Sequence, residues 1–388
     1  MGLRVILDGV FNHSGDRFWA FQDIRTRKQG SVYKDWYVIT GWEPFQYEGW
    51  AGFGGLPVYR EDGNGLNQGI AEHIFHITRR WMDPNQDGDP SDGIDGWRLD
   101  VPNEVQSAFW RKWRILVKGI NKDAFITGEI WENAKSWLKG DEFDSVMNYE
   151  FTKLLYRFFI HARPEYKISP SKLDQGLQDL LQSYPMQVNL VLQNLLDSHD
   201  TDRILSGIRN PDRDFDSRNR LQENDPYDSE KPGEKEVQIF KLIQVFQFTF
   251  PGSPMIYYGD EAGLWGADDP NNRMPMIWKD IDLSAFREDI LVHTRKMAGL
   301  RNRFKALREG TYSPFLLDDK KDIFSFIRKH GDQILYVILN NSVMSQEIKL
   351  PIRGRKIRDI LNDKSYTGNS GEFTVSLKPK YGALFILE

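Results

Sequence analysis

Short apolar runs alternate with longer amphipathic segments along the first three quarters of the chain. The short runs predict six β-strands, at residues 3–10, 93–101, 124–131, 143–149, 194–200 and 253–261. Between them, apolar residues recur at i, i+3 and i+4 in segments such as 67–82 and 104–120, which is the spacing of an amphipathic helix. Strands that alternate with helices are typical of a parallel sheet, so the pattern predicts an α/β fold.

The pattern changes beyond a helical segment near 286–306. Five apolar runs follow with no helix between them, at 323–329, 333–341, 345–351, 372–377 and 381–388. They predict a small antiparallel β domain over 307–388. Two earlier stretches show neither the helical nor the strand period. Residues 31–66 are rich in Gly, Trp and Tyr and predict a loop excursion, whereas the polar stretch 209–236 predicts a solvated loop.

The composition argues against several classes of partner. A net charge of −5 disfavours nucleic acid or an anionic membrane as the main partner, because both are bound through clustered basic residues. No apolar run reaches 18 residues, so no membrane-spanning helix is expected. Twelve Trp, 15 Tyr and 24 Phe suit a large core and also packing against sugar rings. The absence of Cys excludes disulfides and thiolate chemistry, and leaves the compartment, cytoplasm or periplasm, open.

Ionisable residues stand at the ends of several predicted strands, where a β/α barrel places its catalytic groups. They are Asp8 on the first strand, Arg98 and Asp100 on the second, Glu129 on the third and Asp200 on the fifth. Residues two apart on a strand face the same side, so Arg98 and Asp100 are expected to meet. A neighbouring guanidinium lowers the pKa of an aspartate and keeps its carboxylate ionised.

Three carboxyl groups at three strand ends suit the cleavage of a glycosidic bond. That reaction needs an ionised carboxylate as nucleophile, for which Asp100 is the candidate, and a second carboxyl group that protonates the leaving group. Glu129 follows an apolar run and is the candidate proton donor. Asp200 is the candidate for holding sugar hydroxyls, with His199 and His13 as neutral donors. Any one of these acids could instead cap a helix or form a surface ion pair, so the hypothesis depends on the set.

Four ordered motifs resemble the conserved regions of the α-amylase superfamily of retaining glycoside hydrolases. They are DGVFNH at 8–13, GWRLDVPNE at 96–104, GEIW at 128–131 and LLDSHD at 195–200. The segment DDPNNRMPMIW at 268–278 is most similar to the cyclomaltodextrinase, neopullulanase and maltogenic amylase group. The resemblance implies a (β/α)8 TIM barrel over 1–306, interrupted by the loop excursion at 31–66, and a C-terminal antiparallel β-sandwich domain over 307–388.

The resemblance also implies a role for each matching residue. Asp100 would be the nucleophile, Glu129 the general acid/base and Asp200 the transition-state stabiliser, while Asp8 would brace Arg98. The positions that match substrate-contacting residues are Asn12, His13, Arg98, Glu104, Trp131, His199, Asp269 and Arg273. For Trp131, plain packing is the alternative. The implied reaction is retaining hydrolysis of α-1,4-glucosidic bonds in cyclodextrins, maltooligosaccharides or pullulan, with transglycosylation as a side reaction and no cofactor required.

The sequence departs from the family pattern in two ways, and these departures leave alternative functions open. The two barrel strands that precede the first motif in the family, and the amino-terminal β domain of this group, have no counterpart here, so about six barrel strands are expected instead of eight. An open sheet of this kind exposes an apolar edge and favours association, including a homo-oligomer. The alternatives are a catalytically inactive or glucan-binding homologue and a fragment that needs a partner to complete its barrel. The segment LPVYRED at 56–62 also differs from relatives, so substrate preference is not implied.

Acidic residues cluster in DPNQDGDPSDGID at 83–95, which fits the beginning of an EF-hand-type calcium loop. The oxygen ligands would come from Asp83, Asn85, Asp87, Asp89 and Asp92. The twelfth position is Ile94, where that loop normally has a bidentate Glu, so a solvated acidic turn is the equal alternative to a structural calcium site. His73 and His76 have helical spacing but no acidic third ligand, so no zinc site is expected there.

Overall fold

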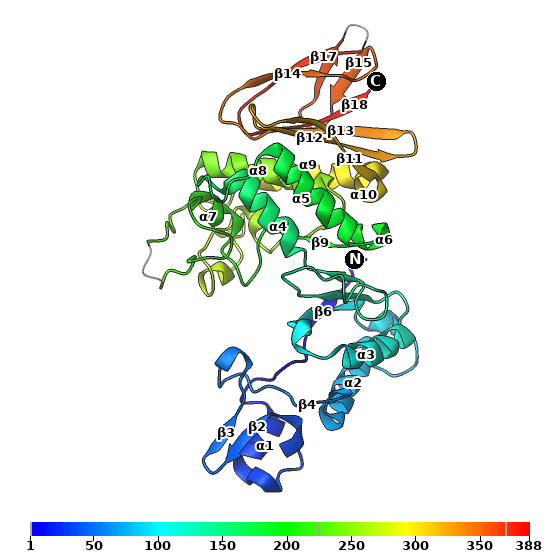
Figure 1. The fold of residues 1–388 in the computed structure, drawn as a ribbon, viewed down its shortest axis with the longest axis vertical. Helices are drawn as coiled ribbons and strands as arrows, with labels where there is room; N and C mark the ends of the chain where they lie inside the picture. Colours follow the sequence, from blue (N-terminus) through cyan, green and yellow to red (C-terminus); the bar gives the residue numbers. More distant parts are fainter. Residues whose placement is uncertain (1, 223–225, 369–370) are drawn as a thin grey trace. The chain divides into compact units, whose positions relative to one another are not determined.

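The computed structural model describes residues 2–222, 226–368 and 371–388. Contacts divide the chain into two compact units, Met1–Met147 and Asn148–Glu388. Each unit has its own sheets, and Figure 1 labels many of the helices and strands in chain order.

A four-stranded parallel sheet forms the centre of the first unit. Its strands are β1 (Ile6–Val10), β6 (Gly96–Asp100), β7 (Phe125–Gly128) and β8 (Ser145–Val146), in the order β1-β6-β7-β8. The register places Asp8 beside Arg98 and Leu99 beside Gly128. Four of the predicted strands are therefore confirmed, although each is shorter than its apolar run. The second of them ends at Asp100, as predicted, and the third ends one residue before Glu129.

Two amphipathic helices connect these strands, and α1 (Trp19–Arg27) precedes them. In α2 (Gln68–Met82) the buried residues are Ile70, Ile74, Thr78 and Met82, one turn apart, and the Asn67 side chain caps the helix by accepting the N–H of Gly69. In α3 (Ser107–Ile120) the buried residues are Phe109, Trp110, Trp113 and Val117. Trp113 packs edge-on against Trp97 of β6, which attaches α3 to the sheet. This helix begins after the predicted residue 104, because Pro102–Glu104 forms a separate 3-10 turn, η5.

The excursion at 31–66 contains more regular structure than its composition predicts. It holds the hairpin of β2 (Ile39–Trp42) with β3 (Phe45–Tyr47) and the pair of β4 (Glu61–Asp62) with β5 (Gly65–Leu66). Three short 3-10 turns, η1 (Lys28–Gly30), η2 (Lys34–Trp36) and η3 (Trp50–Gly52), lie beside them. Strands of two to four residues are too short to show a period in the sequence, so the composition of this excursion did not predict them.

The second unit begins with a helical region. Its α-helices are α4 (Tyr149–Leu155), α5 (Pro170–Ser183), α6 (Met186–Asn189), α7 (Ile204–Arg209), α8 (Glu234–Thr249), α9 (Glu288–Arg303) and α10 (Lys305–Glu309), with turns η6 (Tyr156–Ile160), η7 (Asp260–Ala262) and η8 (Asn271–Arg273). A parallel pair, β9 (Gln193–Asn194) and β10 (Ser253–Pro254), lies among them. The predicted strand 194–200 was therefore too long, because pairing stops at Asn194 and polar side chains further along bond to other elements of the unit. Asp197, for example, accepts the N–H of Ile204 at 2.6 Å.

The polar stretch 209–236 is only partly solvated. Between the end of α7 and the start of α8 its described residues form neither helix nor strand. Arg213 and Asn219 are nevertheless buried, and the Tyr227 hydroxyl donates to buried Asp202 at 2.5 Å. The predicted solvated loop is therefore buried at these positions, where polar partners satisfy its side chains.

The C-terminal β domain is confirmed. A six-stranded antiparallel sheet has the order β11 (Thr311–Asp318), β12 (Ile323–His330), β13 (Gln333–Asn340), β18 (Tyr381–Leu387), β15 (Lys356–Asp359), β16 (Lys364–Thr367). A second pair, β14 (Gln346–Leu350) and β17 (Phe373–Leu377), completes it. Alternating residues of the two sheets form one core, including Ile338, Ile348, Val375 and Phe385. Figure 1 shows this domain in orange and red beside α8, α9 and α10.

Arg328 joins this domain to the helices of the same unit, and Arg301 connects those helices to one another. Arg328 of β12 is fully buried and donates to the backbone carbonyls of Thr249, Gly310 and Thr311. Arg301 of α9 donates to the carbonyl of Phe248 at the C-terminal end of α8. Cations are favourable at a helix C-terminus, where carbonyl groups lack helical partners. Burial lowers the pKa of Arg328 to about 9, which leaves the guanidinium charged at neutral pH.

Replacing Arg328 with Met is expected to lower the free energy of unfolding by about 3 kcal/mol, because three backbone carbonyls, two of them in buried hydrogen bonds, lose a charged donor. Urea denaturation followed by circular dichroism measures this change. Arg353→Met, at an exposed position, is the matched control and should change stability by less than about 0.5 kcal/mol. Equal stability of the two variants would contradict the structural role given to Arg328.

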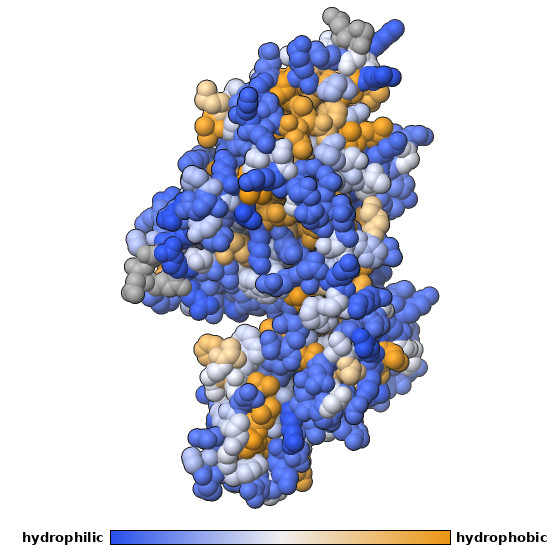
Figure 2. All heavy atoms as spheres, viewed as in Figure 1, coloured by the Kyte–Doolittle hydropathy of each residue, from blue (hydrophilic) through white to orange (hydrophobic). Residues whose placement is uncertain are grey.

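The surface is mainly hydrophilic, and in the view of Figure 2 its apolar side chains form scattered patches. Among the described residues, none of the helices has the length and apolar character needed to cross a lipid bilayer.

Candidate active site

Arg98 is the centre of a carboxylate cluster in the first unit. Its Nη1 lies 2.8 Å from Oδ1 of Asp8 and 2.8 Å from Oδ1 of Asp100, while its Nη2 lies 2.8 Å from Oε2 of Glu129. Strand register explains the first two contacts, because Asp8 lies beside Arg98 on β1 and Asp100 is two residues further along β6. The expected meeting of Arg98 with Asp8 and Asp100 is confirmed, and Glu129 joins them.

Burial and charge both act on this cluster. Burial alone lowers the pKa of Arg98, but the negative charges of Glu129, Asp8 and Asp100 raise it overall, so the guanidinium stays protonated. The side chain of Glu129 is 4% exposed and that of Asp100 is 21% exposed. One guanidinium therefore holds a buried carboxyl group and a partly exposed one close together. Two neighbouring carboxyl groups in such different environments can divide the roles of nucleophile and proton donor.

Strained backbone lies directly beside the pair. Val101 has φ 35° and ψ 50°, a left-handed conformation that is rare for a β-branched residue. Its N–H points to Oε2 of Glu129 at 3.3 Å, and the Trp131 indole N–H donates to the other oxygen, Oε1, at 3.2 Å. Strain of this kind is commonly retained at functional sites. Sequence reasoning missed Val101, because a backbone conformation leaves no signal in residue type.

Asn12 and His13 continue from β1 into the same region. Both are buried, and the Asn12 amide lies 3.2 Å from Nδ1 of His13. The His13 ring stacks on Trp50 with centroids 5.5 Å apart. Burial lowers the pKa of His13, and the negative charge of Asp100 opposes part of that shift. His13 is therefore a neutral side chain near the Asp100 carboxylate at pH 7.

A second cluster of predicted residues lies in the unit Asn148–Glu388. Asp200 is held on two sides, with His199 Nε2 3.1 Å from its Oδ2 and Arg273 Nη2 3.2 Å from its Oδ1. Arg273 also pairs with Asp269, Nε to Oδ1 at 2.8 Å. The structure thus brings together His199, Asp200, Asp269 and Arg273, which are up to 74 positions apart in sequence.

The predicted residues therefore form two groups, one in each unit. That both groups meet the same sugar stays a prediction. Glu104 is exposed, and its side chain contacts the neighbouring Asn103 at 3.5 Å. Two buried residues were missed from the sequence: Asn272, whose amide donates to the backbone carbonyl of His199 beside Asp200, and Arg203, which donates to the carbonyl of Asn272. Asn272 stands inside the DPNNR motif, so its place between Asp269 and Arg273 was the available signal.

The acidic loop at 83–95 uses its side-chain oxygens in hydrogen bonds with its own backbone. Asp83, Asn85, Asp87 and Asp89 accept the N–H groups of Gly88, Asp87, Asp89 and Ser91, respectively. Across residues 2–222, 226–368 and 371–388, no three Asp, Glu, His or Cys side chains are arranged to bind a metal ion. His73 packs against Trp36 instead, with ring centroids 5.5 Å apart.

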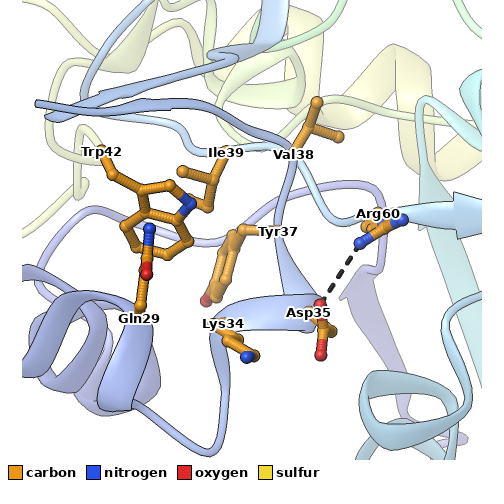
Figure 3. A pocket seen from close by; sticks show the side chains of 8 residues that line it. All are labelled: Gln29, Lys34, Asp35, Tyr37, Val38, Ile39, Trp42 and Arg60. Atoms are coloured by element: carbon orange, nitrogen blue, oxygen red, sulfur yellow. Dashed lines mark hydrogen bonds and ion pairs between the residues drawn. The ribbon is translucent and has the colours of Figure 1, made fainter.

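A separate cavity of about 460 Å³ opens in the excursion of the first unit. Figure 3 shows the side chains that line it, with the Asp35–Arg60 ion pair, which is 3.3 Å long, marked by a dashed line. The residues that line it include none of the predicted catalytic or substrate-contacting positions. This cavity is therefore distinct from the Arg98 cluster.

Comparison with known proteins agrees with this geometry. Residues 1–295 match the family model described as alpha amylase, catalytic domain, and residues 314–384 match the maltogenic amylase C-terminal domain. Neopullulanase 2 of Thermoactinomyces vulgaris is 36% identical over 99% of this chain and 60% of its own length. The cyclomaltodextrinase of Geobacillus thermopakistaniensis is 34% identical over 100% of this chain and 60% of its own length.

A solved structure of a glucan hydrolase also matches this chain over its whole length. The cyclic α-maltosyl-(1→6)-maltose hydrolase from Arthrobacter globiformis, in its ligand-free form, superimposes with a TM-score of 0.78 and 29% identity, covering 100% of this chain and 76% of that one. The chain spans about 60% of the length of the curated relatives named above. With a catalytic-domain model matched over 1–295, this chain belongs to the α-amylase family of glycoside hydrolases.

Proposed function

We propose that this protein hydrolyses α-1,4-glucosidic bonds in cyclodextrins, maltooligosaccharides or pullulan with retention of anomeric configuration. The observation that carries the proposal is the Arg98 cluster, in which one guanidinium contacts both Asp100 and Glu129 at 2.8 Å. Retaining glycosidases need two carboxyl groups about 5–5.5 Å apart, so that one reaches the anomeric carbon while the other reaches the leaving oxygen.

In the proposed first step, an oxygen of Asp100 attacks the anomeric carbon and forms a covalent glycosyl ester. Glu129, in its protonated form, gives its proton to the departing glycosidic oxygen as the bond from that oxygen to the anomeric carbon breaks. In the second step, Glu129 takes a proton from water, the water oxygen attacks the anomeric carbon, and the Asp100 carboxylate leaves. A sugar hydroxyl in place of water gives transglycosylation. No cofactor is needed for this sequence, because the two carboxyl groups supply both the nucleophile and the proton transfer.

The second cluster supplies the proposed contacts with the sugar on the donor side. We propose that Asp200 and His199 bind hydroxyl groups of the sugar undergoing attack, and that Asp269 and Arg273 contact the next sugar. This requires the catalytic domain to extend over 1–306, with 307–388 as the C-terminal domain. The names of the relatives, neopullulanase and cyclomaltodextrinase, support the choice of α-glucan substrates.

Other aspects of the proposal rest on narrower support. The hydrogen bonds in the loop 83–95 favour a turn over a calcium site, because its oxygens already accept backbone N–H groups.

A relative named intracellular maltogenic amylase, 34% identical over 90% of this chain, supports the cytoplasm over the periplasm. Association between copies is supported by exposed apolar residues on the edge strand β1, Ile6 and Val10.

The stereochemistry of the product tests the proposal. Proton NMR of a fresh digest of maltotriose or β-cyclodextrin is expected to show the α-anomer of the new reducing end first, followed by slow mutarotation to the β-anomer. An initial β-anomer would contradict retention. If the folded chain binds β-cyclodextrin by calorimetry but releases no product, the alternative of a glucan-binding homologue holds instead.

A further inference from the structure

Asn272 is fully buried in η8, between the two members of the Asp269–Arg273 ion pair. Its amide Nδ2 donates to the backbone carbonyl of His199 at 2.8 Å and to that of Thr201 at 2.7 Å. These carbonyls lie on either side of Asp200 in the chain. One side chain therefore holds the backbone both before and after Asp200.

The main chain of Asn272 is held by the same segment in return. Arg203, also fully buried, donates from Nε to the carbonyl oxygen of Asn272 at 2.8 Å. Its Nη1 donates to the carbonyl of Tyr258 at 2.6 Å and pairs with Asp260 at 3.1 Å. The Arg203 backbone N–H completes the connection by donating to Gly266 at 3.0 Å. The segment 199–203 and the segment 258–273 are thus joined at several buried points.

The exposed contacts of the cluster are too weak to set its geometry alone. The side chains of Arg273 and Asp200 are 44% and 34% exposed, and that of Asp269 is 46% exposed. Ion pairs at such positions contribute little, because water and salt screen them and long side chains lose entropy on pairing. Hydrogen bonds among fully buried groups are costly to break, because a buried polar group that loses its partner cannot form a hydrogen bond with water instead. The buried bonds of Asn272 and Arg203 therefore decide where Asp200 lies relative to Arg273.

We propose that Asn272, held by Arg203, is a positioning residue for the reaction: it sets Asp200 and Arg273 at the spacing that grips two successive sugars of the glucan. This inference rests on the proposed function. In this proposal Asn272 has no direct contact with the sugar. It acts through the backbone on either side of Asp200.

The choice of Asn at this position follows from its two N–H donors. Asp has the same size and shape but only acceptors, so its carboxylate would face the carbonyls of His199 and Thr201. Repulsion between these groups is expected to push the Asp200 segment away. Asn272→Asp is therefore a sharp test, because it reverses the interaction with almost no change in volume.

The C-terminal sheet offers a matched control in the same unit. Asn340 is fully buried in β13, and its Nδ2 donates to the carbonyls of Lys378 at 2.7 Å and Met344 at 2.9 Å. Asn340→Asp creates the same repulsion away from the Asp200 segment. Both variants are expected to lower the melting temperature, and both are assayed well below it, with the folded fraction verified by circular dichroism.

With β-cyclodextrin as substrate, Asn272→Asp is expected to lower kcat/KM per folded molecule about 100-fold, mostly through kcat, because a displacement of about 1 Å costs roughly that much. Asn340→Asp is expected to stay within about twofold of the wild type. If Asn272→Asp retains wild-type kcat/KM, or if Asn340→Asp loses as much, the positioning role is wrong.

Hydrogen exchange separates this inference from the proposed function. Amides of the peptide 197–203 are expected to exchange at least about tenfold faster in Asn272→Asp than in the wild type or in Asn340→Asp, whether or not the protein turns over glucan. A wild type without activity on α-glucans would overturn the proposed function. Unchanged exchange in the peptide 197–203 would overturn the role of Asn272.

Discussion

Asp100→Asn is expected to lower kcat/KM on β-cyclodextrin by roughly 10⁴-fold or more, because an amide cannot form the covalent glycosyl intermediate. Removing the nucleophile of a covalent mechanism costs on the order of 10⁶-fold in a well-studied protease. The fold should tolerate the change, since the Asn oxygen can still accept the Nη1 donor of Arg98 that Asp100 accepts at 2.8 Å. Product release by chromatography and thermal melting together measure the effect.

Asp8→Asn is the matched control for this change. Asp8 contacts the same Nη1 of Arg98 at the same 2.8 Å distance, but it is 51% exposed and has no proposed contact with the reacting carbon. Its replacement is expected to lower kcat/KM only about tenfold, through looser positioning of Arg98. Losses of equal size in the two variants would mean that both aspartates merely orient Arg98, and Asp100 would no longer be the nucleophile.

Glu129→Gln is expected to show an effect that depends on the leaving group. On an α-1,4-glucan, loss of the proton donor should lower the rate of bond cleavage by about 10²–10⁴-fold. On an α-glucosyl fluoride the first step should be nearly unaffected, because fluoride leaves without a proton. The glycosyl enzyme should then accumulate, since Gln cannot activate water.

Added azide makes this prediction decisive. Azide needs no general base, so it should release the trapped intermediate as an α-glycosyl azide, detected by mass spectrometry and NMR. Asp100→Asn should give no such product. A Glu129→Gln variant that loses equal activity on glucan and on glucosyl fluoride, or that forms no azide adduct, would show that Glu129 is not the acid/base. Its contacts with Arg98 and Trp131 would then serve only to position other groups.

Particular residues show which structural features a local sequence pattern predicts and which it does not. Two-residue alternation placed Arg98 and Asp100 on one face of a strand, and the contact between them confirms it. The predicted strand 194–200 extended too far, because backbone pairing stops at Asn194 although Leu195 and Leu196 are still buried. Apolar periodicity reports which residues face a core. It does not report where backbone pairing stops.

Some residues of the candidate site were predicted from the sequence and others were not. Asp100, Glu129 and Asp200 were candidates from their residue types and motifs, but Val101 was not, because its left-handed backbone is imposed by the surrounding fold. Asn272 looked like any polar residue of a loop motif. In the structure its amide donates to two carbonyls more than 70 positions earlier in the chain.

The sequence by itself determined the α/β region followed by an antiparallel domain, the core faces of its helices, and the carboxyl groups available for chemistry. These depend on periods of two and 3.6 residues and on residue type, which are local properties. Only the tertiary structure decided that Glu129 joins Asp8 and Asp100 on one guanidinium, that Arg328 holds the C-terminal sheet to α8, and that Asn272 holds the backbone around Asp200. Each of these depends on the register and path of segments far apart in the chain, which no local pattern specifies.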